Sequence, residues 1–239
     1  MKAIKCYALA VTVGLCATFG AVMPSAAGDY NGNFMVKAGV TGVLPNSEFD
    51  GLSLNGVPLL SGDIAEVDDS WVPSLTLTYF VNKNIGVELF CCFAQHGVEA
   101  KGALAGAGFK DLGETMIFPP ILSLQYHFDG IRGIKPYVGA GVQFIHFFDT
   151  ESEIGGSLDI DSAFGFSLQG GVDVEIGGGW YAGADVRYTW LDTEATFTNV
   201  PGLGRLETDF DLDPLLVSAH VGYRFDLLGR RTAAIEPLK

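Results

Sequence analysis

Residues 164–176 read FGFSLQGGVDVEI, and this stretch decides the fold. Every second residue from Phe164 to Ile176 is apolar or glycine, whereas the residues between them are small or polar and include Asp173 and Glu175. A period of two places successive side chains on opposite faces of a β-strand. One face of this strand is therefore apolar, and the other carries two carboxylates.

The same alternation recurs in seven further segments, at residues 34–43, 71–80, 85–96, 118–128, 138–144, 180–190 and 215–225. A tilted strand needs about nine to eleven residues to cross a bilayer, and a sheet in lipid must close so that no backbone edge is left unpaired. The sequence therefore predicts an all-β protein, an eight-stranded antiparallel transmembrane β-barrel.

The links between these segments alternate in length. Short turns are expected at residues 81–84, 129–134 and 177–179, and long links at residues 44–70, 97–116, 149–161 and 192–213. This asymmetry is typical of outer-membrane barrels with short periplasmic turns and four long extracellular loops. Aromatic residues near the short turns predict an interfacial girdle. They are Tyr79, Phe80, Tyr126, Phe128, Trp180, Tyr181, Tyr223 and Phe225.

A soluble periplasmic sandwich or lipocalin-like barrel is the alternative architecture. Its polar face would carry more Lys, Glu and Arg than these strands do, which favours the membrane barrel. The net charge of −14 excludes a protein that neutralises nucleic acid phosphates. At the N-terminus, Lys2 and Lys5 precede an apolar run that ends in small residues. We therefore expect a cleaved signal peptide at 1–27, the barrel at 28–225 and a short polar tail at 226–239.

Several strings along the chain carry a family resemblance, including NIGVEL at 84–89, LQYHF at 124–128, KPYVGAGV at 135–142, ADVRY at 184–188 and GYRF at 222–225. In their order, they resemble the OmpW family of outer-membrane proteins. The resemblance implies a narrow barrel with a hydrophobic channel for uptake of small apolar molecules, with AlkL-type alkane importers as relatives. The chain departs from the family pattern at Ala163-Phe164, at Phe90 and in the tail after Phe225.

The long loops contain many large apolar residues, which must bury against something. Two interpretations stay open: the loops pack into a cap without a function, or the cap forms a pocket that captures an apolar solute. For the pocket, we predict a channel lining or gate made of Phe90, Phe164, Leu52 and Leu54. The solute would leave through the barrel or sideways into the membrane.

The inward-facing positions predict a polar network that fills the lumen. An eight-stranded barrel encloses little space, and buried charges of both signs must pair. The predicted members are Lys37, Glu88, Gln125, His127, Gln143, Gln169, Asp173, Glu175, Asp185, Arg187, His220 and Arg224. We interpret this network as structural, with a proton or ion path as the less favoured alternative.

Function is predicted as passive uptake of small hydrophobic molecules through the outer membrane of a Gram-negative bacterium. The long loops also hold 20 of the 28 acidic residues. The alternative is therefore a structural or surface-interaction protein whose acidic loops bind envelope components, and a lumen-gated ion pore is a third hypothesis. Expected partners are outer-membrane lipids, lipopolysaccharide and small hydrophobic solutes. No catalytic motif or metal spacing is found in the sequence, so no enzyme activity, metal or cofactor is expected.

Overall fold

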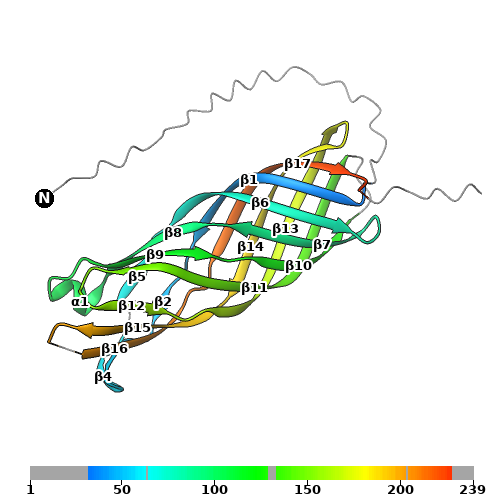
Figure 1. The fold of residues 1–239 in the computed structure, drawn as a ribbon. Coiled ribbons are helices and arrows are strands. Elements are labelled where there is room, and N and C mark those ends of the chain that lie inside the picture. The colour runs from blue at the N-terminus through cyan, green and yellow to red at the C-terminus, as the bar shows by residue number, and fades with distance from the viewer. Residues whose placement is uncertain (1–31, 63, 129–132, 203, 228–239) are drawn as a thin grey trace, which may run out of the picture.

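A computed structural model describes residues 32–62, 64–128, 133–202 and 204–227 and contains a closed antiparallel barrel (Figure 1). Its strands are β1 (Phe34–Leu44), β6 (Ser70–Phe80), β7 (Ile85–Cys92), β10 (Ile121–His127), β11 (Ile134–Ser152), β13 (Ala163–Gly177), β14 (Trp180–Trp190) and β17 (Leu215–Phe225). Each strand pairs with the next one, and β17 pairs with β1 from Phe34↔Phe225 to Leu44↔Leu215. The predicted eight-stranded barrel is confirmed.

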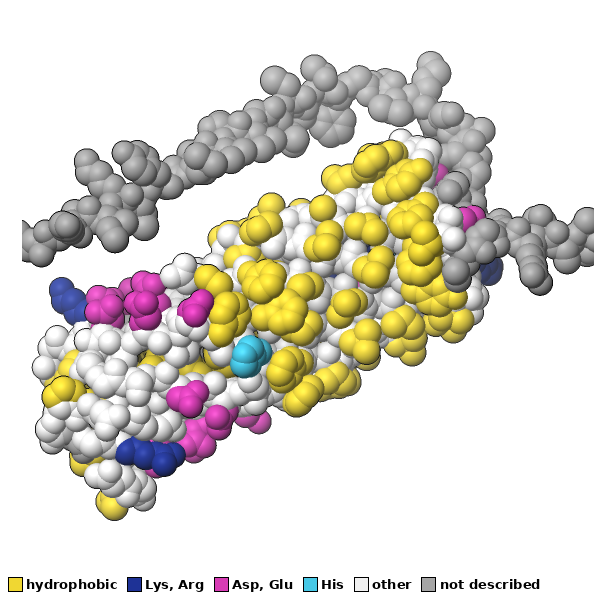
Figure 2. All heavy atoms as spheres, viewed as in Figure 1, with side chains coloured by type: hydrophobic (Ala, Val, Ile, Leu, Met, Phe, Trp, Pro, Cys, Tyr) yellow, Lys and Arg dark blue, Asp and Glu magenta, His cyan; other side chains and the backbone are white. Residues whose placement is uncertain are grey.

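Alternation along the strands sets which side chains face out. On β13, Leu168 is 43% exposed, whereas its neighbour Gln169 is buried; on β14, Val186 is exposed and Arg187 is buried. Figure 2 shows apolar side chains gathered over the barrel wall and acidic side chains gathered toward the loop end. The apolar face of the sheet thus points outward, as a barrel in lipid requires.

The short-turn end is closed by its own side chains. Gly177 ends β13, and Gly178 and Gly179 form the turn to β14; their φ angles of 115°, 63° and 86° favour glycine at each position. The predicted aromatic girdle is wrong for Phe80 and Tyr181, which point inward and pack with Met35. The reason is the strand period: adjacent residues such as Tyr79 and Phe80 cannot both face lipid.

The long links are strands rather than irregular loops. They contain β2 (Glu48–Phe49), β3 (Leu52–Leu54), β4 (Val57–Leu60), β5 (Ala65–Val67), β8 (Ala94–Ala100), α1 (Gly102–Gly106), β9 (Asp111–Phe118), β12 (Ser157–Ile160), β15 (Asp192–Val200) and β16 (Gly204–Asp211). β5, β8 and β9 extend the barrel sheet along the outer half of β11, and the other six strands form a second sheet. Together these elements, which we call the cap, continue past the end of the barrel (Figure 1).

The main apolar core lies in the cap and the adjoining end of the barrel. Within the described part of the chain, no helix is both long and apolar enough to cross a membrane. The predicted signal peptide lies outside the described residues, as does the tail apart from Asp226 and Leu227.

Candidate functional site

A cavity of about 330 Å³ lies inside the cap and reaches the outer ends of the barrel strands. Each of the four long links contributes large apolar side chains to its wall. Examples are Phe49, Leu52, Leu112, Leu158, Phe197 and Phe210. The volume is that of a pocket for a small molecule, and its lining matches an apolar ligand. The cap is thus both a packed apolar structure and a pocket.

The predicted lining residues divide into three groups. Leu52 lines the cavity, and Leu54 packs against the apolar cluster around it. Phe90 is only 1% exposed and belongs to the same cluster. Phe164 is the error: it is 73% exposed on the outer face, against Phe144 with 4.9 Å between ring centroids. It shares the register of Phe166 and Leu168, so it faces outward and does not line the interior.

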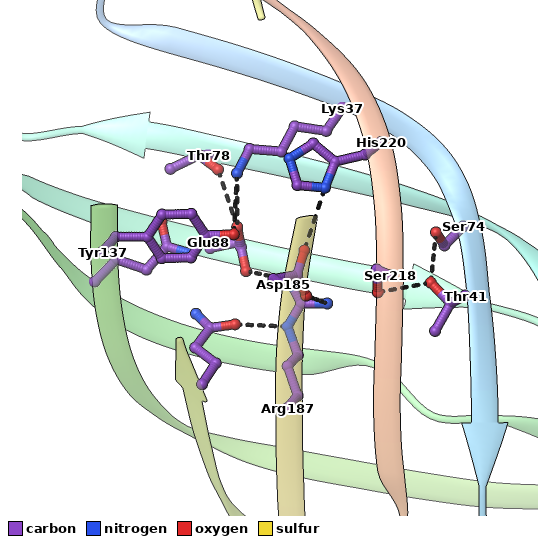
Figure 3. Close-up of polar contacts among 12 residues, drawn as sticks. Lys37, Thr41, Ser74, Thr78, Glu88, Tyr137, Asp185, Arg187, Ser218 and His220 are labelled. Atoms are coloured by element: carbon purple, nitrogen blue, oxygen red, sulfur yellow. Dashed lines mark hydrogen bonds and ion pairs between the residues drawn. The ribbon is translucent and has the colours of Figure 1, made fainter. Parts of the chain in front are cut away.

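Below the cavity, a network of buried charges crosses the barrel interior (Figure 3). Lys37 Nζ on β1 lies 3.0 Å from Asp173 Oδ2 on β13 and 3.9 Å from Glu88 Oε2 on β7. Thr78 also donates a hydrogen bond to Glu88 at 3.4 Å. Residues far apart in the sequence therefore meet because the closed sheet turns every second side chain toward one axis.

Arg187 is the second buried cation of the network. Its Nη2 lies 3.0 Å from Glu88 Oε1, and its Nη1 lies 2.9 Å from Asp185 Oδ1. Its Nε donates to the side-chain oxygen of Gln169. Glu88 is consequently shared by both cations, Lys37 and Arg187, and the network is one connected unit.

His220 links the two aspartates. Its Nε2 lies 2.8 Å from Asp173 Oδ1, and its Nδ1 lies 3.2 Å from Asp185 Oδ2. The Nε2 contact with Asp173 is a hydrogen bond, and a protonated ring would also direct an N–H from Nδ1 toward Asp185. In that form, His220, Lys37 and Arg187 together balance the three carboxylates.

The other predicted lumen residues are also inside, and Glu175 alone is half-buried rather than buried. His127 Nε2 lies 3.0 Å from Gln125 Oε1. Gln143 lies higher, where it lines the cavity. Arg224 lies at the short-turn end, with its Cζ 3.6 Å from the Phe80 ring centroid. Only part of the predicted set therefore forms the central ion network.

Phe90 contacts both the apolar core and this network. The Arg187 Cζ lies 4.3 Å from the Phe90 ring centroid, a cation–π contact, and Phe90 also belongs to the main apolar core. Apolar and charged parts of the interior therefore meet at this aromatic ring.

Sequence reasoning did not assign His96 and Thr115 to the pocket, although both line it. His96 Nδ1 lies 2.7 Å from the Asp68 carbonyl oxygen. Burial lowers the pKa of His96, so the ring is neutral near pH 7. The inward register of residues 94–98 is the sequence signal that could have found His96, but its partner Asp68 lies in another link.

Comparisons with known proteins agree with the barrel. The model of the OmpW family matches residues 30–225. The outer membrane protein AlkL of Ectopseudomonas oleovorans is 31% identical, with 84% of this chain and 86% of AlkL covered. The dibenzothiophene metabolism operon protein PahQ of Pseudomonas aeruginosa is 27% identical over 72% of this chain and 79% of PahQ. The crystal structure of the Pseudomonas aeruginosa outer membrane protein OprG has a TM-score of 0.75 at 27% identity, covering 82% of this chain and 96% of OprG.

Proposed function

The chain belongs to the OmpW family of outer-membrane proteins, and from this premise we propose that it takes up small hydrophobic molecules passively across the outer membrane. The observation that carries the proposal is the apolar cavity in the cap. Its wall includes Leu52 and is built from all four long links. A cavity at this end of the barrel can receive an apolar solute before the solute meets the charged interior. No catalytic step is part of the proposal.

The ion network supports release of the solute sideways into the membrane rather than along the barrel axis. To pass along the axis, an apolar molecule would have to separate pairs such as Lys37–Asp173 and Arg187–Glu88, which are 3.0 Å apart and buried. Leaving a buried charge without its partner costs about 3–5 kcal/mol. The hydrocarbon core of the bilayer imposes no such cost on an apolar solute.

The relatives agree with this chemistry. PahQ is named for an operon of dibenzothiophene metabolism, and dibenzothiophene is an apolar aromatic compound. The resemblance to the OmpW family implies the same class of solute. Lipopolysaccharide and membrane lipids are the expected surroundings of the cap and the barrel wall.

The test is uptake of a fluorescent hydrocarbon into vesicles with lipopolysaccharide in the outer leaflet, with a dye that reports arrival in the bilayer. Leu52→Trp fills the cavity, and Leu89→Trp is its matched control because Leu89 is exposed on the barrel wall. We expect Leu52→Trp to reduce protein-dependent uptake to nearly zero and Leu89→Trp to leave it unchanged. Equal uptake with and without the wild-type protein would reject the function.

The acidic loops favour a second candidate, a surface-interaction protein. The long links hold 20 of the 28 acidic residues, and Glu66, Glu99 and Asp209 are among those at the surface. Replacing these three by Gln or Asn would abolish binding to lipopolysaccharide if this were the main role. For a transporter, we expect the same variant to retain uptake of the hydrocarbon.

A further inference from the structure

Three side chains that line the cavity have a buried polar atom without a hydrogen-bond partner among the described residues: His96 (Nε2), Thr115 (Oγ1) and Gln143 (Oε1). His96 and Thr115 lie on the neighbouring strands β8 and β9, and their exposed fractions are 3% and 4%. A buried polar atom without a partner is uncommon and costs free energy. An apolar pocket built only for hydrocarbons would have no need of them.

His96 Nε2 and Thr115 Oγ1 belong to side chains on one patch of the cavity wall. His96 on β8 and Thr115 on β9 are directly paired in the antiparallel register. Both side chains point to the cavity side of this sheet, and such cross-strand neighbours have Cβ atoms about 4.5–5.5 Å apart. One small ligand group can therefore reach both side chains at once.

The hydrogen-bonding properties of the patch follow from the contact of His96 with Asp68. The Asp68 carbonyl can only accept, so His96 Nδ1, 2.7 Å away, carries the proton. Nε2 of the neutral ring is then an acceptor, on a side chain that lines the cavity. The Asp68 backbone N–H in turn donates to the Gly97 carbonyl at 3.1 Å, which holds this segment against β8 and fixes the ring.

The Thr115 hydroxyl can both donate and accept. The patch therefore combines an acceptor on His96 with a donor on Thr115. A ligand hydroxyl has the complementary properties: its O–H can donate to His96 Nε2 while its oxygen accepts from Thr115. A hydrocarbon can satisfy neither atom, and a carboxylate would have to enter an apolar cavity as a charge.

We propose that His96 and Thr115 form a hydroxyl-recognition patch, so that the cavity binds small apolar alcohols and phenols more tightly than hydrocarbons of the same shape. The inference rests on the proposed function, since it names the class of hydrophobic molecule that the cavity prefers. The apolar wall binds the body of the ligand, and the patch orients its hydroxyl.

A direct test is nitrogen NMR of the full-length protein in lipid nanodiscs with ¹⁵N-labelled histidine. The chain has only four histidines, so comparison with His96→Gln assigns the His96 signals. Addition of octan-1-ol should shift the Nε2 resonance of His96, because the acceptor nitrogen gains a hydrogen bond. Addition of octane should leave this resonance in place.

Affinities for octan-1-ol and octane are measured in the same nanodiscs from the methyl signals of leucines in the cavity. One net hydrogen bond corresponds to a change of about threefold to tenfold in affinity. We expect Thr115→Val to weaken octan-1-ol binding by about this factor and to change octane binding little. His96→Gln, which keeps an acceptor near Nε2, should retain more of the preference for the alcohol than His96→Leu.

Thr198→Val is the matched control, because Thr198 on β15 is hydrogen-bonded to Ser157 at an exposed position. It should leave the preference for the alcohol unchanged. If octan-1-ol does not shift the His96 Nε2 resonance, or Thr115→Val leaves the preference intact, the patch is not a recognition site. In that case octane uptake into vesicles would still be faster with the protein, whereas failure of the proposed function itself would remove uptake of both compounds.

Discussion

Arg187→Met tests the ion network most directly, because it removes the guanidinium while keeping a long unbranched side chain. In the wild type, Arg187 lies 3.0 Å from Glu88 and 2.9 Å from Asp185, and packs on Phe90. The variant leaves both carboxylates with one fewer cation in a buried site. Removing one member of a buried pair costs about 3–5 kcal/mol. This is a large part of the free energy of unfolding of a typical domain, which is about 5–15 kcal/mol.

A double-mutant cycle separates the pair from the rest of the site. Glu88→Gln alone leaves Arg187 with a weaker acceptor, whereas the double variant removes the uncompensated charge at position 88. Because the two residues are in contact, we expect the double variant to be more stable than the sum of the single effects implies, by about 0.5–3 kcal/mol.

The free energy of unfolding is measured by urea titration of the protein in lipid vesicles, followed by tryptophan fluorescence from residues such as Trp180 and Trp190. Leu168→Met, at a lipid-facing position, is the control and should change little. A loss of less than about 1 kcal/mol in the free energy of unfolding for Arg187→Met, as for an exposed ion pair, would contradict a stabilising role of the network. Additive effects of Arg187→Met and Glu88→Gln would contradict the coupling between the two residues.

Three further predictions use the same unfolding assay or a proteolysis assay. His220→Leu leaves Asp173 and Asp185 without the imidazole between them, so the barrel should lose several kcal/mol of stability, and His220→Gln should lose less. Leu168→Arg puts a charge on the lipid-facing wall and should cost about 2–4 kcal/mol if it lies near the bilayer midplane, whereas an effect near zero would contradict the orientation of β13. Burial lowers the pKa of His96 below its usual value of 6.5. As the pH falls through this range, the unfolded cap therefore binds more protons than the folded cap does. Stability contributed by neutral His96 is thus present above pH 6.5 and is lost below it, and proteolysis of the cap should accelerate between pH 7 and pH 5 in the wild type more than in His96→Gln.

The barrel could be predicted because strand alternation is a local property of the sequence. For residues such as Leu168 and Gln169, the alternation of the adjacent residues predicts whether the side chain points outward or inward. The same rule exposes the error at Phe164: its place in the alternation faces lipid, although we predicted it as a channel residue. Register thus decides orientation more reliably than residue type does.

The cap could not be predicted in the same way. Several of its strands, such as β2 and β3, are very short, and pairs such as Leu206↔Leu54 join segments far apart in the chain. The contacts of the ion network were also beyond the sequence, although its members were predicted to face inward. Which carboxylate meets Lys37 depends on the stagger of the closed sheet, which places Asp173 nearer to it than Glu88 is.

The seam between β1 and β17 has a consequence for how the molecule assembles. Lys37 on one side of the seam and His220 on the other both contact Asp173. A slip of one residue at the seam would turn Lys37 toward the acyl chains, and a slip of two would keep it inside but carry its ammonium away from that carboxylate. A shifted register between β1 and β17 therefore costs electrostatic free energy. The buried charges thus favour a single alignment of the first and last strands of the barrel.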